Sequence, residues 1–329
     1  MQISMIVISN RAGASGIAET ARLFSQRGTV LDAIEAGIRL VEADENVRSV
    51  GCGGWPNLLG EVQLDASIMD GRTLRAGAIG ALTGYLHPIT IARALMEKLP
   101  HVFLVDQGAA RFANEIGAEA GENVIPDTQA VWEKWFRQEL TDKEKALWPN
   151  APLTELCKHA IDPEISKDTT VFIGQDSVGD VAAGTSTSGW GWKYPGRLGD
   201  SPVIGAGSYA DNRYGACACT GMGEMTIRSG TARSVVLYMK KGATVEDAVY
   251  EAVEDMRALD GGVIGCVIIH AIDNRGRSKV VSVNGEADDH YWMWKEGYPA
   301  PVKELAEVIQ ISSVPVKKTV MDTYGEGRR

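Results

Sequence analysis

The chain has 329 residues, of which 44% are hydrophobic and 23% are charged, and its formal net charge is -10 at pH 7. That mix is typical of a soluble globular protein with a buried core, and the acidic balance argues against nucleic acid or an anionic membrane as a partner. No apolar run approaches the roughly 20 residues that a membrane-spanning helix needs.

The first ten residues indicate a strand and not a signal peptide, because they lack a basic region and a small-residue cleavage site. The five cysteines show no metal-ligand spacing, so we expect reduced thiols, no metal or other cofactor, and a cytoplasmic protein. Cys217 and Cys219 would face one side of a strand, where they are expected to be buried small apolar residues.

Hydrophobic spacing predicts strands and helices through the first 118 residues. Thr29 and Asp32 are spaced like a helix N-terminus, and Pro88 suits the first turn of a helix. The elements expected here are a strand over 3–9, a helix beginning near Thr29, a strand over 62–68 ending at the turn 69–71, and a helix beginning at Pro88.

Charges and four prolines dominate from Glu119 to Asp168, with one helix expected around 131–140. We therefore predict a poorly ordered connection in this region. Beyond it, the sequence again indicates sheets covered by helices, with a loose tail from Ile311. The elements expected there are strands over 170–175, 180–186, near 204, 216–220, 264–269 and 279–283, and helices over 231–240 and 244–258.

Thr169 stands where the charged region meets the strand predicted after it, and no histidine follows within thirty residues. We hypothesise that the chain is cut before Thr169. The freed α-amino group would have a pKa of roughly 7.7–8.0, so it can act as the base for its own hydroxyl without a histidine. The alternative is an ordinary threonine at the start of a strand.

Three Gly-containing loops after Thr169 carry polar side chains: 184–189, 195–202 and 220–224. Arg197 and Asp200 share one of them and can clamp an α-amino acid, the guanidinium on its carboxylate and the carboxylate on its ammonium. The competing interpretation is a salt bridge between the two. Thr220 and Gly221 end a strand where polar groups can face a developing oxyanion, although an ordinary turn explains them too.

Two further patterns need an interpretation. Thr187 lies where a hydroxyl can support a nucleophile, although most strand threonines are there because they favour β-structure. Residues 205–210 fit the G-x-G-x-x-A pattern of dinucleotide sites. However, the strand before this pattern is very short and residues 211–215 open no apolar helix, so nucleotide binding is disfavoured.

Taken together, these motifs resemble the glycosylasparaginase family of N-terminal nucleophile hydrolases, which stands alongside isoaspartyl peptidase/L-asparaginase. The resemblance runs in order through about residues 3–285. The matching segments are Asp168-Thr169, 184–187, 195–202, 205–211 and 218–224 in the second half, and 50–54, 64–71 and 77–80 in the first.

The resemblance implies an α+β fold, namely a four-layer αββα sandwich formed as one domain over residues 1–329. It also implies a self-catalysed cut between Asp168 and Thr169, which gives an α-chain of 1–168 and a β-chain of 169–329, usually assembled as (αβ)₂. On this view the region from Glu119 is the end of an α-chain that can move aside after the cut.

The family's residue roles transfer to matching positions. The resemblance implies that Thr169 is the nucleophile, that Thr187 supports it, and that Thr220 and Gly221 form the oxyanion hole. The remaining substrate-binding residues that the resemblance implies are Arg197 for the α-carboxylate, Asp200 for the α-ammonium, and Gly223.

The implied substrate is a small β-aspartyl amide, with N4-(β-N-acetylglucosaminyl)-L-asparagine first. An isoaspartyl dipeptide or L-asparagine is the alternative, and an uncleaved, inactive binding scaffold is the third possibility. The sequence departs from the family at Lys167, where glycosylasparaginases have His, and at Ile8 to Arg11, which lack the family's aromatic residue. Trp55 is a candidate replacement for that aromatic residue.

Overall fold

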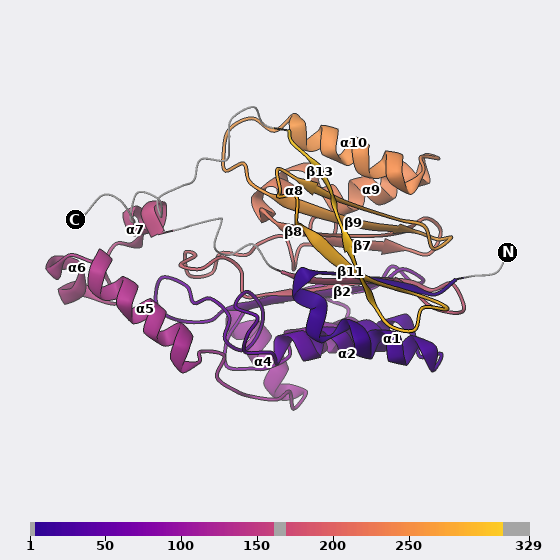
Figure 1. Cartoon of the computed structure of the whole chain (residues 1–329). Helices are drawn as coiled ribbons and strands as arrows, with labels where there is room; N and C mark the ends of the chain where they lie inside the picture. The colour runs from indigo at the N-terminus through magenta and orange to yellow at the C-terminus, as the bar shows by residue number, and fades with distance from the viewer. Residues whose placement is uncertain (1–3, 161–168, 312–329) are drawn as a thin grey trace.

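Two β-sheets run through the part of the chain that the computed structural model describes, residues 4–160 and 169–311 (Figure 1). Within these residues the larger sheet has the order β12-β11-β1-β5-β6-β2-β3-β4, and the smaller has the order β13-β10-β9-β8-β7. The strands of the larger sheet are β1 (Ile6–Asn10), β2 (Leu64–Asp70), β3 (Ala76–Leu82), β4 (Phe103–Val105), β5 (Thr170–Gln175), β6 (Val181–Thr187), β11 (His290–Lys295) and β12 (Val302–Leu305). Those of the smaller sheet are β7 (Ser208–Asp211), β8 (Gly215–Gly221), β9 (Val267–Asp273), β10 (Ser278–Val283) and β13 (Glu307–Ile309).

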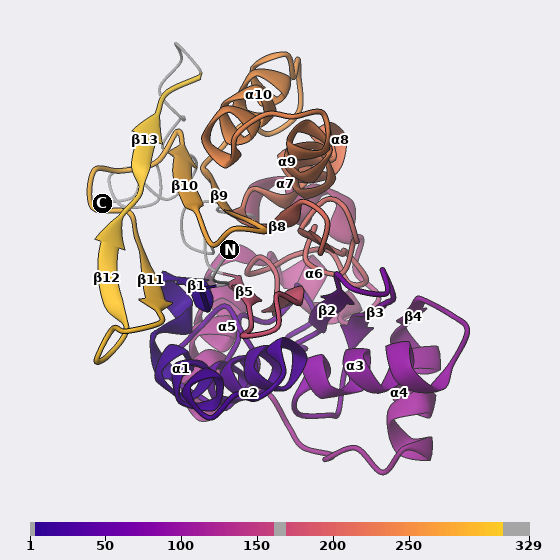
Figure 2. The same cartoon turned by 90° about the vertical axis from the view of Figure 1, so that its right-hand side faces the viewer.

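Helices cover the outer face of each sheet. In Figure 2, α1, α2 and α3 lie along the larger sheet and α9 and α10 along the smaller, while the two sheets contact each other through β5, β6 and β8. The described helices are the 3-10 helix η1 (Arg11–Ser15), α1 (Ile17–Ser25), α2 (Val30–Glu42), α3 (Pro88–Lys98), α4 (Asp106–Glu115), α5 (Pro126–Glu139), α6 (Asp142–Leu147), α7 (Leu153–Ala160), α8 (Gly223–Ser229), α9 (Thr231–Lys240) and α10 (Val245–Arg257). The predicted α+β class is confirmed.

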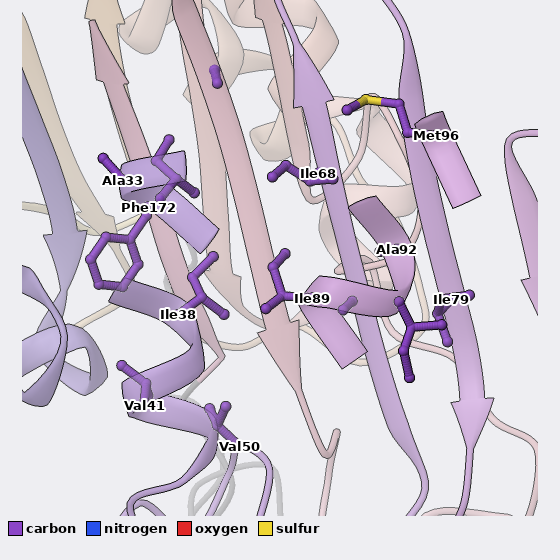
Figure 3. Packing of buried hydrophobic residues seen from close by; sticks show 14 of the residues in the cluster. Ala33, Ile38, Val41, Val50, Ile68, Ile79, Ile89, Ala92, Met96 and Phe172 are labelled. Carbon is purple, nitrogen blue, oxygen red and sulfur yellow. The ribbon is translucent and has the colours of Figure 1, made fainter. Parts of the chain in front are cut away.

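Three groups of buried apolar side chains fill the spaces between these elements. The first lies between the larger sheet and its helices, where Ile38 of α2 and Ile89 of α3 meet Ile68 and Phe172 from the strands (Figure 3). A second group packs α9 and α10 on the smaller sheet, and the third lies between the sheets. Because β5 is buried on both faces, it is a nearly continuous apolar run and not an alternating pattern. The strand β2 is also fully buried, but it alternates apolar residues with Asp65 and Ser67.

Several predicted elements are confirmed close to their expected bounds. Thr29 is the N-cap of α2, and its hydroxyl accepts a hydrogen bond from the Asp32 amide at 3.2 Å. The helix α3 begins at Pro88, and β5 covers residues 170–175 as expected. Cys217 and Cys219 are buried on β8, and no disulfide joins any of the cysteines among the described residues.

Other predictions were wrong. The stretch 126–160 is not a poorly ordered connection, because it forms α5, α6 and α7. Ile204 makes only an isolated bridge to Ser208, and the strands that pair with β8 are β7 and β9. The strand β10 does not close the fold, since β11 and β12 follow it and join the larger sheet beside β1. No helix among the described residues is long and apolar enough to cross a membrane.

Candidate active site

Thr169 is held at the edge of β5 by Asn10, the last residue of β1. The Asn10 amide nitrogen donates to the Thr169 carbonyl oxygen at 2.5 Å, and the Asn10 amide oxygen accepts from the Val171 backbone N–H at 3.1 Å. Both Thr169 and Asn10 are buried. These two hydrogen bonds from Asn10 fix the backbone on the C-terminal side of the predicted cut, while Asp168 lies outside the described residues.

The strand register brings Thr187 next to Thr169. Thr170 pairs with Ser186 across β5 and β6, so the next position along the antiparallel ladder sets Thr169 opposite Thr187. The Thr187 hydroxyl donates to the Ser49 carbonyl oxygen at 3.2 Å and accepts from the Gly189 amide at 2.9 Å. These bonds fix the Thr187 side chain at the end of β6.

Ser201 supplies a hydroxyl to Thr169 that the sequence analysis did not assign. Its Oγ donates to the Thr169 Oγ1 at 3.4 Å, and both side chains are buried. The Ser201 carbonyl oxygen in turn accepts from the hydroxyls of Ser67 at 2.6 Å and Thr185 at 2.7 Å. The loop after β6 is thus anchored on the inner face of the sheet, directly beside the predicted nucleophile.

Arg197 does not form the predicted alternative salt bridge with Asp200. Its Nε and Nη2 donate to the Glu224 carboxylate at 2.8–3.0 Å, and its guanidinium lies 4.2 Å from the centre of the Trp190 ring. The Arg197 guanidinium is therefore held in place by a carboxylate and an aromatic face, two partners that suit its charge and its planar shape.

Asp200 is buried, and its carboxylate accepts from the Thr226 hydroxyl at 2.7 Å. Burial raises the pKa of Asp200 to about 6, although Thr226 and the Arg197 charge act to lower the pKa. A side chain at Gly223 would lie 2.9 Å from the Asp200 carboxylate and backbone nitrogen. The absence of a side chain at Gly223 is therefore what leaves room for Asp200, in keeping with its expected place in the site.

Asp200→Asn is expected to stabilise the protein at neutral pH. Because the folded-state pKa of Asp200 is about 6 and that of a free Asp is about 3.9, ionisation opposes folding by up to about 3 kcal/mol above pH 6, and this cost disappears below about pH 4. The amide keeps an oxygen for Thr226. Thermal unfolding at pH 7.5 and pH 4 measures the effect.

Asp211→Asn is the matched control for this experiment. Hydrogen bonds from Arg213 leave the pKa of Asp211 below its usual value, although burial acts to raise it. The control should therefore destabilise the protein at pH 7.5. An Asp200→Asn protein that unfolds at a lower temperature than the wild type at pH 7.5 would contradict the assigned pKa.

Thr220 and Gly221 end β8 in the smaller sheet, which faces β5 across the sheet interface. Gly221 has φ 104°, and a side chain there would lie 2.3 Å from the Cys266 carbonyl oxygen, so this turn requires glycine. Gly221 also borders a cavity of about 680 Å³. Other residues lining that cavity are Asn10, Arg11, Arg48, Ser49 and Trp55.

The described residues place Ser201 and Thr187 beside Thr169 and Gly223 beside Asp200, and they add groups that sequence reasoning missed. Asn10, Ser49, Ser201 and Glu224 had no assigned role, and only the position of Asn10 directly after a strand offered a signal. The 205–210 pattern leads into the strand β7 and not into a helix, as expected for a chain without a dinucleotide site. A hydroxyl nucleophile, supporting hydroxyls, a cation and a buried carboxylate are the groups needed for acyl transfer from an amino-acid amide.

The sequence profile of the asparaginase family (Asparaginase_2) matches residues 8–294. The chain belongs to this family. The family resemblance and the enzyme class expected from the sequence are thereby confirmed. This asparaginase-family chain is similar to N(4)-(Beta-N-acetylglucosaminyl)-L-asparaginase from Elizabethkingia miricola, with 39% identity over 72% of the chain.

Two further relatives bear other activity names. Isoaspartyl peptidase/L-asparaginase from Bos taurus is 38% identical over 75% of the chain and 76% of its own length. Plant-type L-asparaginase from Thermococcus kodakarensis is 36% identical over 77% of the chain and 81% of its own length. The match to the Elizabethkingia protein spans 64% of that relative, just under two thirds of its length.

Proposed function

We propose that this asparaginase-family protein is a self-processed threonine amidohydrolase that cleaves β-aspartyl amides. The observation that carries the proposal is that two other hydroxyl-bearing residues lie beside Thr169. Ser201 donates to it at 3.4 Å, and the register of β5 and β6 sets it opposite Thr187. The loop that bears Ser201 also presents Arg197 and Asp200, the pair proposed to bind the aspartyl group.

The proposed cut makes a nucleophile from a chain-internal threonine. The Thr169 hydroxyl oxygen attacks the Asp168 carbonyl carbon, the peptide C–N bond breaks, and the acyl group passes from nitrogen to oxygen. Water then hydrolyses the ester, which leaves Asp168 at the end of an α-chain of 1–168 and a free amine on a β-chain of 169–329. The hydrogen bond from Asn10 to the Thr169 carbonyl oxygen supports this step because it fixes the backbone of the nucleophile.

In turnover, the same hydroxyl attacks the β-carbonyl carbon of the substrate while its proton passes to the Thr169 α-amine. Thr220 and Gly221 stabilise the oxyanion. Asp200 takes the substrate's α-ammonium, and Arg197 takes its α-carboxylate. The amine leaves with a proton, and water hydrolyses the β-aspartyl ester to release L-aspartate and the free hydroxyl.

We also propose that the two fragments form one domain of the four-layer αββα type. The support is the packing of helices on the outer face of each sheet and the separate apolar group between the sheets. Assembly as (αβ)₂ and a cytoplasmic location stay predictions.

N4-(β-N-acetylglucosaminyl)-L-asparagine is the proposed lead substrate. Trp55 supports this choice because it lines the cavity beside Asn10 and Ser49, and its ring centre lies 5.8 Å from that of Trp192, with the two rings tilted by 32°. An aromatic face held in this way suits a sugar ring. Isoaspartyl dipeptides and L-asparagine are the alternative, favoured by the names of several relatives.

A comparison of kcat/KM on the three substrates tests the function and the leaving group. The amidohydrolase proposal is overturned if the protein hydrolyses none of the three substrates although intact mass shows that it is cut before Thr169. If GlcNAc-asparagine is the poorest of the three, the lead substrate is wrong and the alternative stands.

Trp55→Ala is expected to lower kcat/KM on GlcNAc-asparagine about tenfold and to change it less than threefold on L-asparagine, because ammonia does not reach the ring. Trp55→Phe is the matched control, since it keeps an aromatic face and should retain most of the activity on the glycosylated substrate. Equal losses on both substrates after Trp55→Ala would remove Trp55 from the leaving-group site.

A further inference from the structure

Lys193 carries a charge in a place where charge is costly. Its side chain is fully buried, and within the described residues its ammonium donates to the Gln63 carbonyl oxygen at 2.9 Å. Asp65 Oδ2 lies 4.0 Å from the ammonium, beyond hydrogen-bond distance. A buried ion is retained when other groups offset its desolvation cost or when it serves a function. The Lys193 ammonium has three N–H donors, and one hydrogen bond and one distant carboxylate offset little of that cost.

The ammonium lies beside the proposed substrate-binding groups. A Cβ added to Gly189 would be 3.0 Å from the Lys193 Nζ and 3.3 Å from the Arg197 Nη1, so both cations abut the same backbone position. The Gly189 amide also donates to the Thr187 hydroxyl. Asp65, whose carboxylate lies 4.0 Å from the Lys193 ammonium, is the residue that pairs with Thr187 across β2 and β6. Lys193 is therefore close to the same cross-strand pair.

The nitrogen of Arg197 that faces Lys193 is the one left available. Glu224 takes Nε and Nη2, while Nη1 has no hydrogen bond to another described residue. Two like charges at one glycine repel each other. Burial first, and the Arg197 charge as well, lower the pKa of Lys193 to about 8, with Asp65 acting to raise it. An anion bound at Nη1 would relieve this repulsion.

We propose that Lys193 is a positioning residue of the carboxylate subsite, whose buried ammonium adds positive potential at Arg197 Nη1 and so favours a substrate α-carboxylate over a neutral group there. The inference rests on the proposed function, in which Arg197 binds that carboxylate. It assigns Lys193 a part in recognition and not in bond breaking, because the ammonium acts through Arg197.

The test compares L-asparagine with L-asparaginamide, in which the α-carboxylate is a neutral carboxamide. Lys193→Met should raise the KM for L-asparagine roughly tenfold with kcat within about threefold. The kinetics of L-asparaginamide, or its inhibition constant if turnover is slow, should not change. Lys193→Gln, which keeps an N–H donor for the Gln63 carbonyl, should show the same loss, because charge is what matters.

Lys241→Met is the matched control, since it removes an exposed lysine after α9 and should leave both substrates unaffected. Thermal unfolding and intact mass establish that each variant is folded and cut before kinetics are compared. Equal losses on both compounds, or rescue by Lys193→Gln, would make Lys193 a structural tie and overturn the proposal. A wild-type protein that hydrolyses no β-aspartyl amide would instead overturn the proposed function.

Discussion

Thr169→Ala is expected to leave the 329-residue chain uncut and to reduce hydrolysis of β-aspartyl amides by roughly 10⁴-fold or more. The substitution removes the hydroxyl that is proposed to attack both the Asp168 carbonyl and the substrate, so processing and turnover should fail together. The fold should persist, because Asn10 holds the backbone of this residue and not its side chain. A denaturing gel and intact mass after prolonged incubation measure the cut.

Two variants make this result specific. Thr169→Ser keeps a hydroxyl and should be cut, although more slowly. Thr170→Ala is the matched control, since its buried hydroxyl has no hydrogen-bond partner among the described residues and it points to the opposite face of β5. That control should be cut and active. Cleavage of the Thr169→Ala chain between the same two residues would exclude the self-processing mechanism, and a wild-type chain that stays whole would exclude the enzyme.

Local signals in the sequence predicted much of the framework correctly. The cap at Thr29, the proline that begins α3 and the apolar run of β5 depend on neighbours only a few residues away. The loops bearing Thr187, Arg197 and Asp200 were recognised as a set because of the family resemblance. Their spacing alone left ordinary turns and salt bridges open.

What the sequence did not reveal are contacts between distant residues. Asn10 is separated by 159 positions from the carbonyl it binds, and no local pattern marks such a pair. Ser201 followed Asp200 in a recognised motif, yet its contact with Thr169 depends on how the loop folds back over Ser67 and Thr185. Asn10 and Ser201 act through tertiary geometry.

The helix expected around 131–140 is confirmed as part of α5, but the start of α5 and the helices α6 and α7 were missed because the prolines and charges of this region were interpreted as breakers. Pro126 instead stands in the first turn of α5, where no N–H is needed, and Thr141 with Glu144 caps α6. Trp132, Phe136 and Trp148 then pack on one another, with ring centres 5.0–6.1 Å apart. These helices gain stability from a small aromatic cluster of their own.

The Arg197–Glu224 contact was not predicted, and it takes the place of the alternative salt bridge between Arg197 and Asp200. Because the guanidinium rests on Glu224 and not on Asp200, Asp200 is left to meet an ammonium, with only Thr226 as its side-chain hydrogen-bond partner among the described residues. A substrate carboxylate that approaches Arg197 can use Nη1 or compete with Glu224 for the fork. In the proposed function, the clamp therefore recognises an amino acid through two separate groups, one for each of its charges.

Arg197→Leu is expected to lower kcat/KM by about 10²–10³-fold on L-asparagine, GlcNAc-asparagine and a β-aspartyl dipeptide alike, mainly by raising KM. The loss should be shared because the guanidinium is proposed to bind the aspartyl part that all three substrates have in common. Leucine keeps contact with Trp190, and the Glu224 side chain is 35% exposed, so its carboxylate regains water and the fold should survive.

Arg213→Leu is the matched control for Arg197→Leu. This substitution breaks a comparable pair between an arginine and a carboxylate, that of Arg213 with Asp211. Arg213 is exposed and its partners include no residue of the proposed site, so all three kcat/KM values should stay within about threefold of the wild type. Arg197→Lys should fall between the wild type and Arg197→Leu, because it keeps the charge and loses the fork. If Arg197→Leu impaired one substrate and spared the others, the guanidinium would belong to the leaving-group side, and the carboxylate would have to be bound elsewhere.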